Sequence, residues 1–213
     1  MSDAVKKRLP RYFRYLRELE NAGVRRVSSK KLAELMGTTA SQIRQDFNCF
    51  GGFGQQGYGY NVSYLYGKIS SILGVTKGYR AVIVGCGNLG RALAGSPMFA
   101  NRGVSLVGLF DISPEIIGKT VAGLEVAGMD RIAEFCREEQ VDIAILTIPR
   151  DAAEDTAAML AEIGVRGIWN FANAELKRLQ PELKIENVHL GDSLMKLCYE
   201  LGSDSGSKTE DET

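Results

Sequence analysis

Apolar side chains recur at helical spacing through the first 22 residues of the chain, with basic side chains between them. The apolar positions are Val5, Leu9, Tyr12, Phe13, Leu16 and Leu19. Intervals of three and four residues place such side chains on one face of a helix, while lysines and arginines lie on the other. The pattern predicts one amphipathic, basic helix at the start of the chain.

Two shorter helices are predicted next, each with its own capping residues. The serines at 28–29 can cap a helix that ends at Gly37, because serine side chains satisfy free amides at helix starts and glycine readily adopts the conformation that ends a helix. The threonines at 38–39 can cap a third helix over residues 40–48. Helix, tight turn and helix in this order predict a helix-turn-helix.

Glycines and aromatic residues alternate over residues 50–60, which fits a short hairpin and not a helix. We interpret this segment as the wing of a winged helix-turn-helix domain. Helical spacing returns over residues 62–73, and the glycines within 74–78 suit a junction. The first domain is therefore predicted to span residues 1–78.

From Tyr79 onward, apolar runs typical of strands alternate with helical stretches. The predicted strands are Ala81–Val84, Val104–Phe110, Ile143–Ile148 and Gly167–Phe171. This alternation is typical of an α/β domain with a mostly parallel sheet, here residues 79–190. Apolar positions at helical spacing predict a final helix over 191–202, and residues 203–213 lack any apolar side chain and are predicted to be disordered.

The net charge of zero conceals two oppositely charged halves. Residues 1–80 contain 14 Lys and Arg against 5 Asp and Glu, a net +9, and residues 81–213 contain 12 against 21, a net −9. A basic module joined to an acidic one favours a domain that binds a polyanion, fused to a domain that does not.

A glycine-rich motif follows the first predicted strand of the second domain. It reads Gly85, Cys86, Gly87, Asn88, Leu89, Gly90. In a G-x-G-x-x-G between a strand and a helix, the first glycine permits a tight turn, the second lets the backbone approach a pyrophosphate, and the third allows close packing of helix on strand. The motif predicts a dinucleotide-binding Rossmann domain.

Asp111 lies 21 residues after Gly90, at the end of the second predicted strand. A carboxylate there can accept hydrogen bonds from both ribose hydroxyls and repels a 2′-phosphate, and no Lys or Arg follows within the next several residues. NAD(H) is therefore favoured over NADP(H), with FAD a lesser alternative.

The third predicted helix exposes residue types that contact DNA. Arg44 can reach guanine edges or phosphates, and Ser41, Gln45 and Asn48 are suited to reading base edges from the major groove. The predicted wing adds Gln55, Gln56 and Tyr58 as candidate DNA-contacting residues. Together with the charge of +9, these residues favour double-stranded DNA as a partner.

Cysteine spacing argues against a metal site. The four cysteines, at 49, 86, 136 and 198, form no Cys-x-x-Cys pair, and His189 is the only histidine. We expect reduced thiols and no metal. No apolar run approaches the roughly 20 residues that span a bilayer and no export signal is evident, so a cytoplasmic location is expected.

The order of several motifs resembles the bacterial redox-sensing repressor family Rex over nearly the whole chain. The stretches that carry the resemblance are residues 7–12, 43–47, 50–62, 84–90, 144–149 and 164–171. The resemblance implies a homodimer that binds a pseudo-palindromic operator when NADH is scarce and releases it when NADH binds, with the C-terminal helix exchanged between subunits.

The resemblance also implies further cofactor positions. Thr147, Ile148 and Pro149 would contact the nucleotide together with residues 85–90 and Asp111, while Asn170 and Phe171 would lie towards the nicotinamide. An apolar nicotinamide pocket would prefer NADH over NAD, because a cationic ring is costlier to desolvate. Phe99 and Phe171 are its candidate walls.

The chain departs from the family pattern in two places. Glutamines stand at 45, 55 and 56 where members often carry basic residues, which predicts a weaker salt dependence or an altered operator. Ser96 replaces a tyrosine that many members have, which puts in doubt any subunit contact made by that tyrosine.

Two other functions compete with a repressor. An oxidoreductase would need a placed acid or base, but Tyr64 and Lys68 precede the glycine motif and His189 has no evident carboxylate partner in the sequence. A thiol-sensing regulator would need an exposed, acidic thiol at Cys49 or Cys86.

Overall fold

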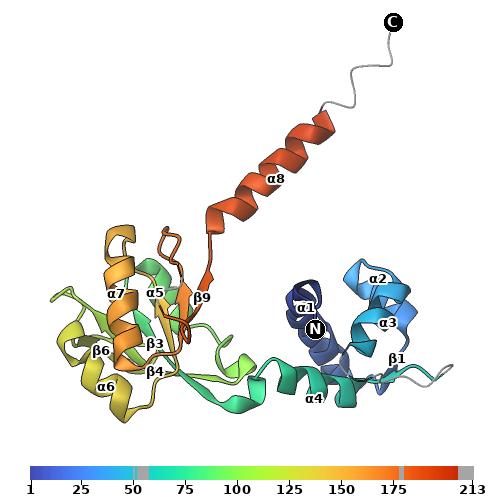
Figure 1. Ribbon diagram of the computed structural model, residues 1–213, viewed down its shortest axis with the longest axis horizontal. Helices are drawn as coiled ribbons and strands as arrows, with labels where there is room; N and C mark the ends of the chain where they lie inside the picture. The colour runs from blue at the N-terminus through green and yellow to red at the C-terminus, as the bar shows by residue number, and fades with distance from the viewer. Residues whose placement is uncertain (50, 52–57, 178–179, 206–213) are drawn as a thin grey trace, which may run out of the picture. The chain divides into compact units, whose positions relative to one another are not determined.

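The computed structural model describes residues 1–49, 51, 58–177 and 180–205. The chain divides into two compact units, Met1–Lys77 and Gly78–Thr213. The first unit contains helices α1 (Asp3–Asn21), α2 (Ser29–Met36), α3 (Ala40–Asn48) and α4 (Val62–Ile72), a short 3₁₀ helix (Val75–Lys77), and the paired strands β1 (Arg26–Val27) and β2 (Tyr60–Asn61). Both units are drawn in Figure 1.

The helix-turn-helix forms where its caps predict it. The Ser28 side chain accepts the Lys31 amide at 3.0 Å, and Thr39 accepts the Gln42 amide at 3.2 Å. Gly37 ends α2 in the left-handed conformation, with φ of 60°. The two helices and α1 and α4 enclose a core whose fully buried side chains include Tyr12, Leu16, Leu32, Ile43, Phe47, Leu65 and Ile69.

The predicted wing lies mostly outside the described residues. Where the description resumes, β2 pairs with β1 in antiparallel fashion, with Val27 opposite Tyr60. Gly59, with φ of 69°, precedes this pair, and a Cβ atom there would lie 2.8 Å from the Val27 carbonyl oxygen. The close approach requires glycine.

The second unit is built on a seven-stranded sheet of order β5-β6-β4-β3-β7-β8-β9. The strands are β3 (Tyr79–Val84), β4 (Val104–Asp111), β5 (Thr120–Val121), β6 (Leu124–Gly128), β7 (Ile143–Leu146), β8 (Gly167–Asn170) and β9 (Lys184–Asn187). All neighbours pair in parallel except β5 with β6. The parallel α/β fold is confirmed, although β5, β6 and β9 were not predicted.

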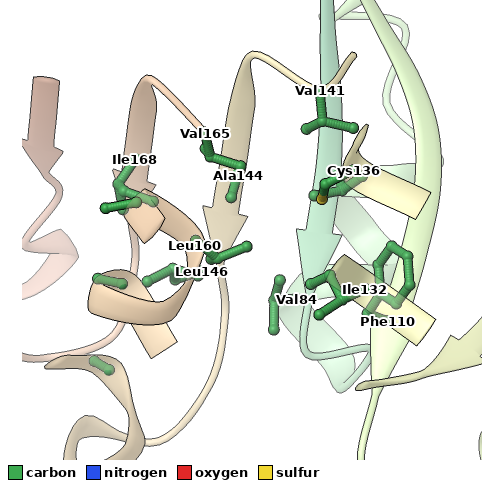
Figure 2. Close-up of a cluster of buried hydrophobic side chains, with 14 of the residues drawn as sticks. Val84, Phe110, Ile132, Cys136, Val141, Ala144, Leu146, Leu160, Val165 and Ile168 are labelled. Carbon is green, nitrogen blue, oxygen red and sulfur yellow. The ribbon is translucent and has the colours of Figure 1, made fainter. Parts of the chain in front are cut away.

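Helices cover both faces of this sheet. Along β3, Val82 and Val84 belong to one core cluster, while Ala81 and Ile83 belong to another, because alternate residues of a strand point to opposite faces. Helices α6 (Ile132–Glu138) and α7 (Arg150–Ile163) close the first cluster, shown in Figure 2. Helix α5 (Asn88–Ala94) contributes to the second, and short 3₁₀ turns lie at Ala100–Arg102 and Met129–Arg131.

The last helix, α8, is longer than the predicted 191–202, since it runs from Leu190 to Ser205. Residues 203–205, predicted to be disordered, are therefore helical, and the remaining tail lies outside the described residues. Large apolar side chains on α8 are 52–77% exposed: Leu190, Leu194, Met195, Leu197, Tyr199 and Leu201. Among the described helices, none is both long enough and apolar enough to cross a membrane.

Candidate functional site

The glycine-rich loop connects β3 to α5, and two of its glycines are needed for packing. Gly85 has φ of 95°, and a Cβ atom there would lie 2.7 Å from the Thr147 carbonyl oxygen. A Cβ atom on Gly90 would overlap the Gly85 carbonyl oxygen. Gly87 has open space where its Cβ would be. The middle glycine therefore leaves the loop backbone accessible to a ligand.

Asp111, at the end of β4, is held against this loop by its own hydrogen bonds. Its Oδ2 accepts the Cys86 amide at 2.6 Å, and its Oδ1 accepts the Ser113 amide at 2.8 Å. Each carboxylate oxygen can accept two hydrogen bonds. One acceptor position on each oxygen therefore remains for a ligand such as a ribose diol.

A pocket of about 320 Å³ opens beside the loop. Six predicted cofactor residues line it: Gly85, Gly87, Asp111, Thr147, Ile148 and Pro149. Six more were missed: Val84, Ile112, Ile116, Met129, Ala152 and Thr156. The helical spacing of Ala152 and Thr156 after Pro149 is a signal that would have indicated the first turns of α7 as a wall.

Thr147 lines the pocket and also holds the glycine-rich loop, whereas two predicted loop residues lie outside the pocket lining. The Thr147 hydroxyl donates to the Gly85 carbonyl oxygen at 2.6 Å, which ties β7 to the turn. Asn88 is exposed and accepts a hydrogen bond from Arg91 at 2.9 Å, and Leu89 is half-buried. Neither Asn88 nor Leu89 lines the pocket.

The Cys86 thiol does not fit a thiol sensor. The side chain is 1% exposed, and burial, together with the charge of Asp111, raises the pKa of the thiol to about 11. A protonated thiol in the interior is a poor nucleophile. Cys49, the other suggested position, is exposed at the end of α3.

The side chain of Asn170, a residue expected to lie towards the nicotinamide, is directed into the protein. It is fully buried, and its amide nitrogen donates to the Ala174 carbonyl oxygen at 2.7 Å and to Asn187 Oδ1 at 2.9 Å. Its oxygen accepts the Ala172 amide at 3.0 Å. These bonds use both amide hydrogens and connect the end of β8 to the segment after it and to β9.

An aromatic cluster lies next to that strand end. The Phe171 and Trp169 ring centroids are 4.6 Å apart, and those of Trp169 and Phe99 are 6.3 Å apart. Phe99 is buried and Phe171 is half-buried. These rings belong to the second core cluster, in which Phe171 follows the carboxyl end of β8 and the Phe99 carbonyl oxygen accepts the Val104 amide at the amino end of β4.

His189 has a carboxylate partner, which the sequence analysis missed. Its Nε2 lies 2.8 Å from Glu175 Oε2, and Glu175 Oε1 accepts from Asn187 at 3.3 Å. Neither residue lines the pocket beside the glycine-rich loop. The pair joins the segment after β8 to the residue immediately before α8.

The predicted DNA-contacting residues of α3 lie on its exposed side. Ser41, Arg44, Gln45 and Asn48 are all exposed. Arg44 Nη1 donates to Ser29 Oγ at 3.2 Å, so its side chain reaches across to the start of α2.

At the base of the predicted wing, Tyr58 is 70% exposed, while Gln55 and Gln56 lie outside the described residues. Sequence reasoning missed Arg26 in this region. Its guanidinium donates to the Tyr58 carbonyl oxygen at 3.1 Å and lies 5.9 Å from the Tyr58 ring centroid. β1 therefore supplies a cation next to Tyr58. The sequence signal for Arg26 is the basic pair at 25–26 just before the helix-turn-helix.

Across the part of the chain that is described, no group of three or more His, Cys, Asp or Glu side chains could hold a metal ion.

These features define a two-domain protein in which a winged helix-turn-helix precedes a Rossmann-type domain with a dinucleotide pocket. Family models agree with both halves: one described as "Putative DNA-binding protein N-terminus" matches residues 1–48, and one described as "CoA binding domain" matches residues 76–174. The chain belongs to the redox-sensing transcriptional repressor Rex family.

Curated relatives with that name are similar over almost their whole length. The repressor from Caldicellulosiruptor bescii is 48% identical over 201 residues, which are 94% of this chain and 92% of the relative. The one from Caldanaerobacter subterraneus subsp. tengcongensis is 48% identical over 204 residues, 96% and 91% of the two chains. These relatives are transcriptional repressors and not oxidoreductases.

Solved structures of a Rex-family repressor are also similar to this chain. RSP in complex with β-NAD⁺ and operator DNA has a TM-score of 0.90 and 46% identity, and the match covers 100% of this chain and 99% of RSP. RSP in complex with β-NADH has a TM-score of 0.87 and 45% identity, with 96% of each chain covered. RSP itself is described as a Rex-family repressor.

Proposed function

We propose that this chain is a transcriptional repressor that responds to the balance of NADH and NAD. As a homodimer it binds a pseudo-palindromic operator when NADH is scarce, and it releases the operator when NADH binds. The observation that carries the proposal is the similarity, over the full chain, to RSP, which was solved with β-NAD⁺ and operator DNA and also with β-NADH. The cytoplasm is the compartment we propose for this activity.

The pocket beside the glycine-rich loop fits the ADP-ribose half of the cofactor. The open backbone at Gly87 suits a pyrophosphate, and the two remaining acceptor positions of Asp111 match the two ribose hydroxyls. Apolar side chains of Ile112, Ile148 and Pro149 provide a surface for adenine. The Asp111 carboxylate would repel a 2′-phosphate, so NAD(H) is favoured over NADP(H).

The nicotinamide half is proposed to lie towards the aromatic cluster of Phe99, Trp169 and Phe171. A cationic nicotinamide pays a larger desolvation penalty near such rings than a neutral dihydronicotinamide does. This difference gives NADH the stronger interaction. Asn170 contributes by holding the end of β8 through its buried hydrogen bonds, and not by contact with the ring.

The DNA-binding surface is proposed to consist of α3 and the wing. Arg44 is suited to guanine or phosphate, and Ser41, Gln45 and Asn48 to base edges. Tyr58, Gln55 and Gln56 would extend the contact from the wing. The excess of 14 basic over 5 acidic residues in the first 80 attracts the phosphate backbone.

Helix α8 is proposed to be the dimerisation element, exchanged between two subunits. Six large apolar side chains on this helix are each more than half exposed in the single chain. A contiguous exposed apolar surface of this kind marks a protein interface. A dimer with two-fold symmetry presents two recognition helices, which explains the expected pseudo-palindromic operator.

The test is fluorescence anisotropy of a labelled palindromic operator, titrated with the protein and then with NADH or NAD at fixed salt. A 100-fold loss of operator affinity requires about 2.7 kcal/mol of coupling, so NADH must bind that much better to the DNA-free protein. Release by NADH at concentrations where NAD has no effect is the expected result. Arg44→Ala serves as the control that should lose operator binding and keep NADH binding.

Two outcomes would contradict the proposal. Equal release by NADH and NAD would exclude redox sensing, and absence of operator binding at low salt would exclude a repressor. Deletion of residues 190–213 tests the dimer: sedimentation should show a monomer, and operator affinity should fall sharply. A truncated chain that remains dimeric would contradict the role of α8.

A further inference from the structure

Asp46 is a buried carboxylate in the middle of α3 that the proposed DNA contacts do not use. Its side chain is 1% exposed, yet it accepts four hydrogen bonds. Arg8 donates from Nε to Oδ2 at 2.6 Å and from Nη2 to Oδ1 at 2.7 Å. The Tyr12 hydroxyl donates to Oδ2 at 2.7 Å, and Gln42 Nε2 donates to Oδ1 at 2.8 Å. All acceptor positions of the carboxylate are thus filled by protein donors.

The donors come from two helices at matched spacing. Arg8 and Tyr12 are four residues apart on α1, and Gln42 and Asp46 are four residues apart on α3, so each pair lies on one face of its helix. Arg8 binds with both of its guanidinium edge donors, which fixes direction as well as distance. The network therefore restricts the rotation of α3 about its axis and its tilt against α1.

The carboxylate is ionised in this setting. Burial opposes the charged form, but hydrogen bonds from Arg8, Tyr12 and Gln42 outweigh it and hold the pKa of Asp46 below its ordinary value. Burial and the same carboxylate raise the pKa of the Tyr12 hydroxyl, so it remains a donor. The interaction is a charged one in a water-poor environment, where geometry is strongly enforced.

We propose that Asp46 is a positioning residue for operator recognition, acting through Arg8 and Tyr12, and that it excludes Gln42 from base reading. This inference rests on the proposed function and assigns a role to residues that make no DNA contact. Because successive residues of a helix are separated by about 100°, a small rotation of α3 would move Ser41, Gln45 and Asn48 away from the bases together. Gln42, although it is next to Ser41 in sequence, is held by Asp46, the residue through which α3 bonds to α1.

The first test compares Asp46→Asn and Tyr12→Phe with the parent chain. In Asp46→Asn the new side-chain NH₂ group faces donor groups of Arg8 or Gln42 and cannot accept their hydrogen bonds. Tyr12→Phe removes one donor and leaves the carboxylate paired with Arg8. We expect operator affinity to fall more than tenfold for Asp46→Asn and about threefold for Tyr12→Phe. Binding to non-specific DNA and to NADH should stay within twofold, because phosphate attraction and the pocket of the other unit are unaffected.

A purely structural role predicts a different result. If Asp46 only stabilised the fold, specific and non-specific DNA binding would both fall in proportion to the fraction of protein that is folded. Circular dichroism measures that fraction at the temperature of the assay. The informative quantity is therefore the ratio of operator affinity to non-specific affinity. If Asp46→Asn does not fold, Tyr12→Phe, which removes only a hydroxyl, still reports on that ratio.

The second test compares Gln42→Ala with Gln45→Ala on operators that carry single base changes. Gln45→Ala should alter the order of base preference, while Gln42→Ala should leave that order unchanged and weaken all operators equally, by about threefold. A change of preference in Gln42→Ala, or an unchanged operator to non-specific ratio in both folded variants of the first test, would overturn the inference. Failure of the parent chain to bind any operator would instead contradict the proposed function.

Discussion

The Asp111 carboxylate allows a quantitative test of the cofactor site. Of its four acceptor positions, the Cys86 and Ser113 amides occupy two, which leaves two for the ribose hydroxyls. A hydrogen bond to a charged group contributes about 1.5–3 kcal/mol. Asp111→Ala removes both, and the lower limit of about 3 kcal/mol corresponds to an NADH affinity more than 100-fold weaker.

The same substitution affects the protein without cofactor. The amide of buried Cys86 loses its acceptor, and an unsatisfied buried donor costs about 1–3 kcal/mol of stability. Operator binding should persist in the folded variant, but the NADH concentration needed for release should rise by the same factor as the dissociation constant. The preference for NADH over NADPH should narrow, since the repelling charge is gone.

Calorimetric titration with NADH gives the affinity, and the fluorescence of Trp169, the single tryptophan, gives an independent signal. Glu138→Ala removes an exposed acid on α6 that lies outside the pocket, and it controls for the loss of one negative charge. A folded Asp111→Ala protein that binds NADH within about threefold of the parent would refute the assignment of Asp111 to the ribose.

Three further results are expected. Arg26→Ala should weaken binding to operator and to non-specific DNA equally, and it should lower the slope of log affinity against log salt by about 0.9. Arg137→Ala, in the other unit, should leave both affinities and the slope unchanged. An unchanged slope for Arg26→Ala would exclude Arg26 from phosphate contact. At pH 8 an alkylating reagent should modify exposed Cys49 quickly and leave Cys86 and Cys136 unmodified. The reason is that burial raises the pKa of both buried thiols to about 11. Rapid alkylation of Cys86 would instead support the hypothesis of a thiol-sensing regulator. Since the pKa of Asp46 is lowered by folding, its ionised form stabilises the first unit above the ordinary value of about 3.9, and this stability is lost as the pH falls below it. The melting temperature, followed from pH 6 to pH 2, should drop steeply below about pH 4 in the parent chain and less steeply in Asp46→Asn. Parallel curves of melting temperature against pH for the two proteins would contradict this role of the Asp46 carboxylate.

The parts of the fold that depend on neighbouring residues were predictable from sequence. Ser28, Thr39 and Gly37 cap the helix-turn-helix through contacts within four residues, and the glycine-rich loop carries its own spacing. The strands β5, β6 and β9 were missed because short strands of two to five residues near the margins of a sheet carry little apolar pattern. Their formation depends on pairing partners that sequence proximity does not reveal.

Polar groups with distant partners were also missed. Asp46 is of a residue type that is usually exposed on a helix, and its hydrogen-bond donors Arg8 and Tyr12 lie 38 and 34 residues away in the sequence. His189 and Glu175 are 14 residues apart, across the whole of β9. Asn170 matched a family position near the cofactor, but only the structure shows that Asn187 and Ala174 use its amide. Sequence reasoning placed the residues near the site without their orientation.

Asp46 and Asn170, two of the buried polar residues, share one arrangement: other protein groups satisfy their hydrogen bonds, and each is followed or preceded by a half-exposed or exposed residue that is proposed to contact a ligand. Asp46 stands next to Gln45, and Asn170 next to Phe171. If the buried member acts only by orienting its neighbours, its loss should make the neighbour's substitution less harmful. Asp46→Asn combined with Arg44→Ala should therefore weaken operator binding by less than the product of the two single effects. Asp111→Ala combined with Arg44→Ala should give the full product, because those residues lie in different units and are proposed to bind different ligands. A fully multiplicative effect for Asp46 and Arg44 would mean that the carboxylate contributes to DNA binding independently of the recognition helix.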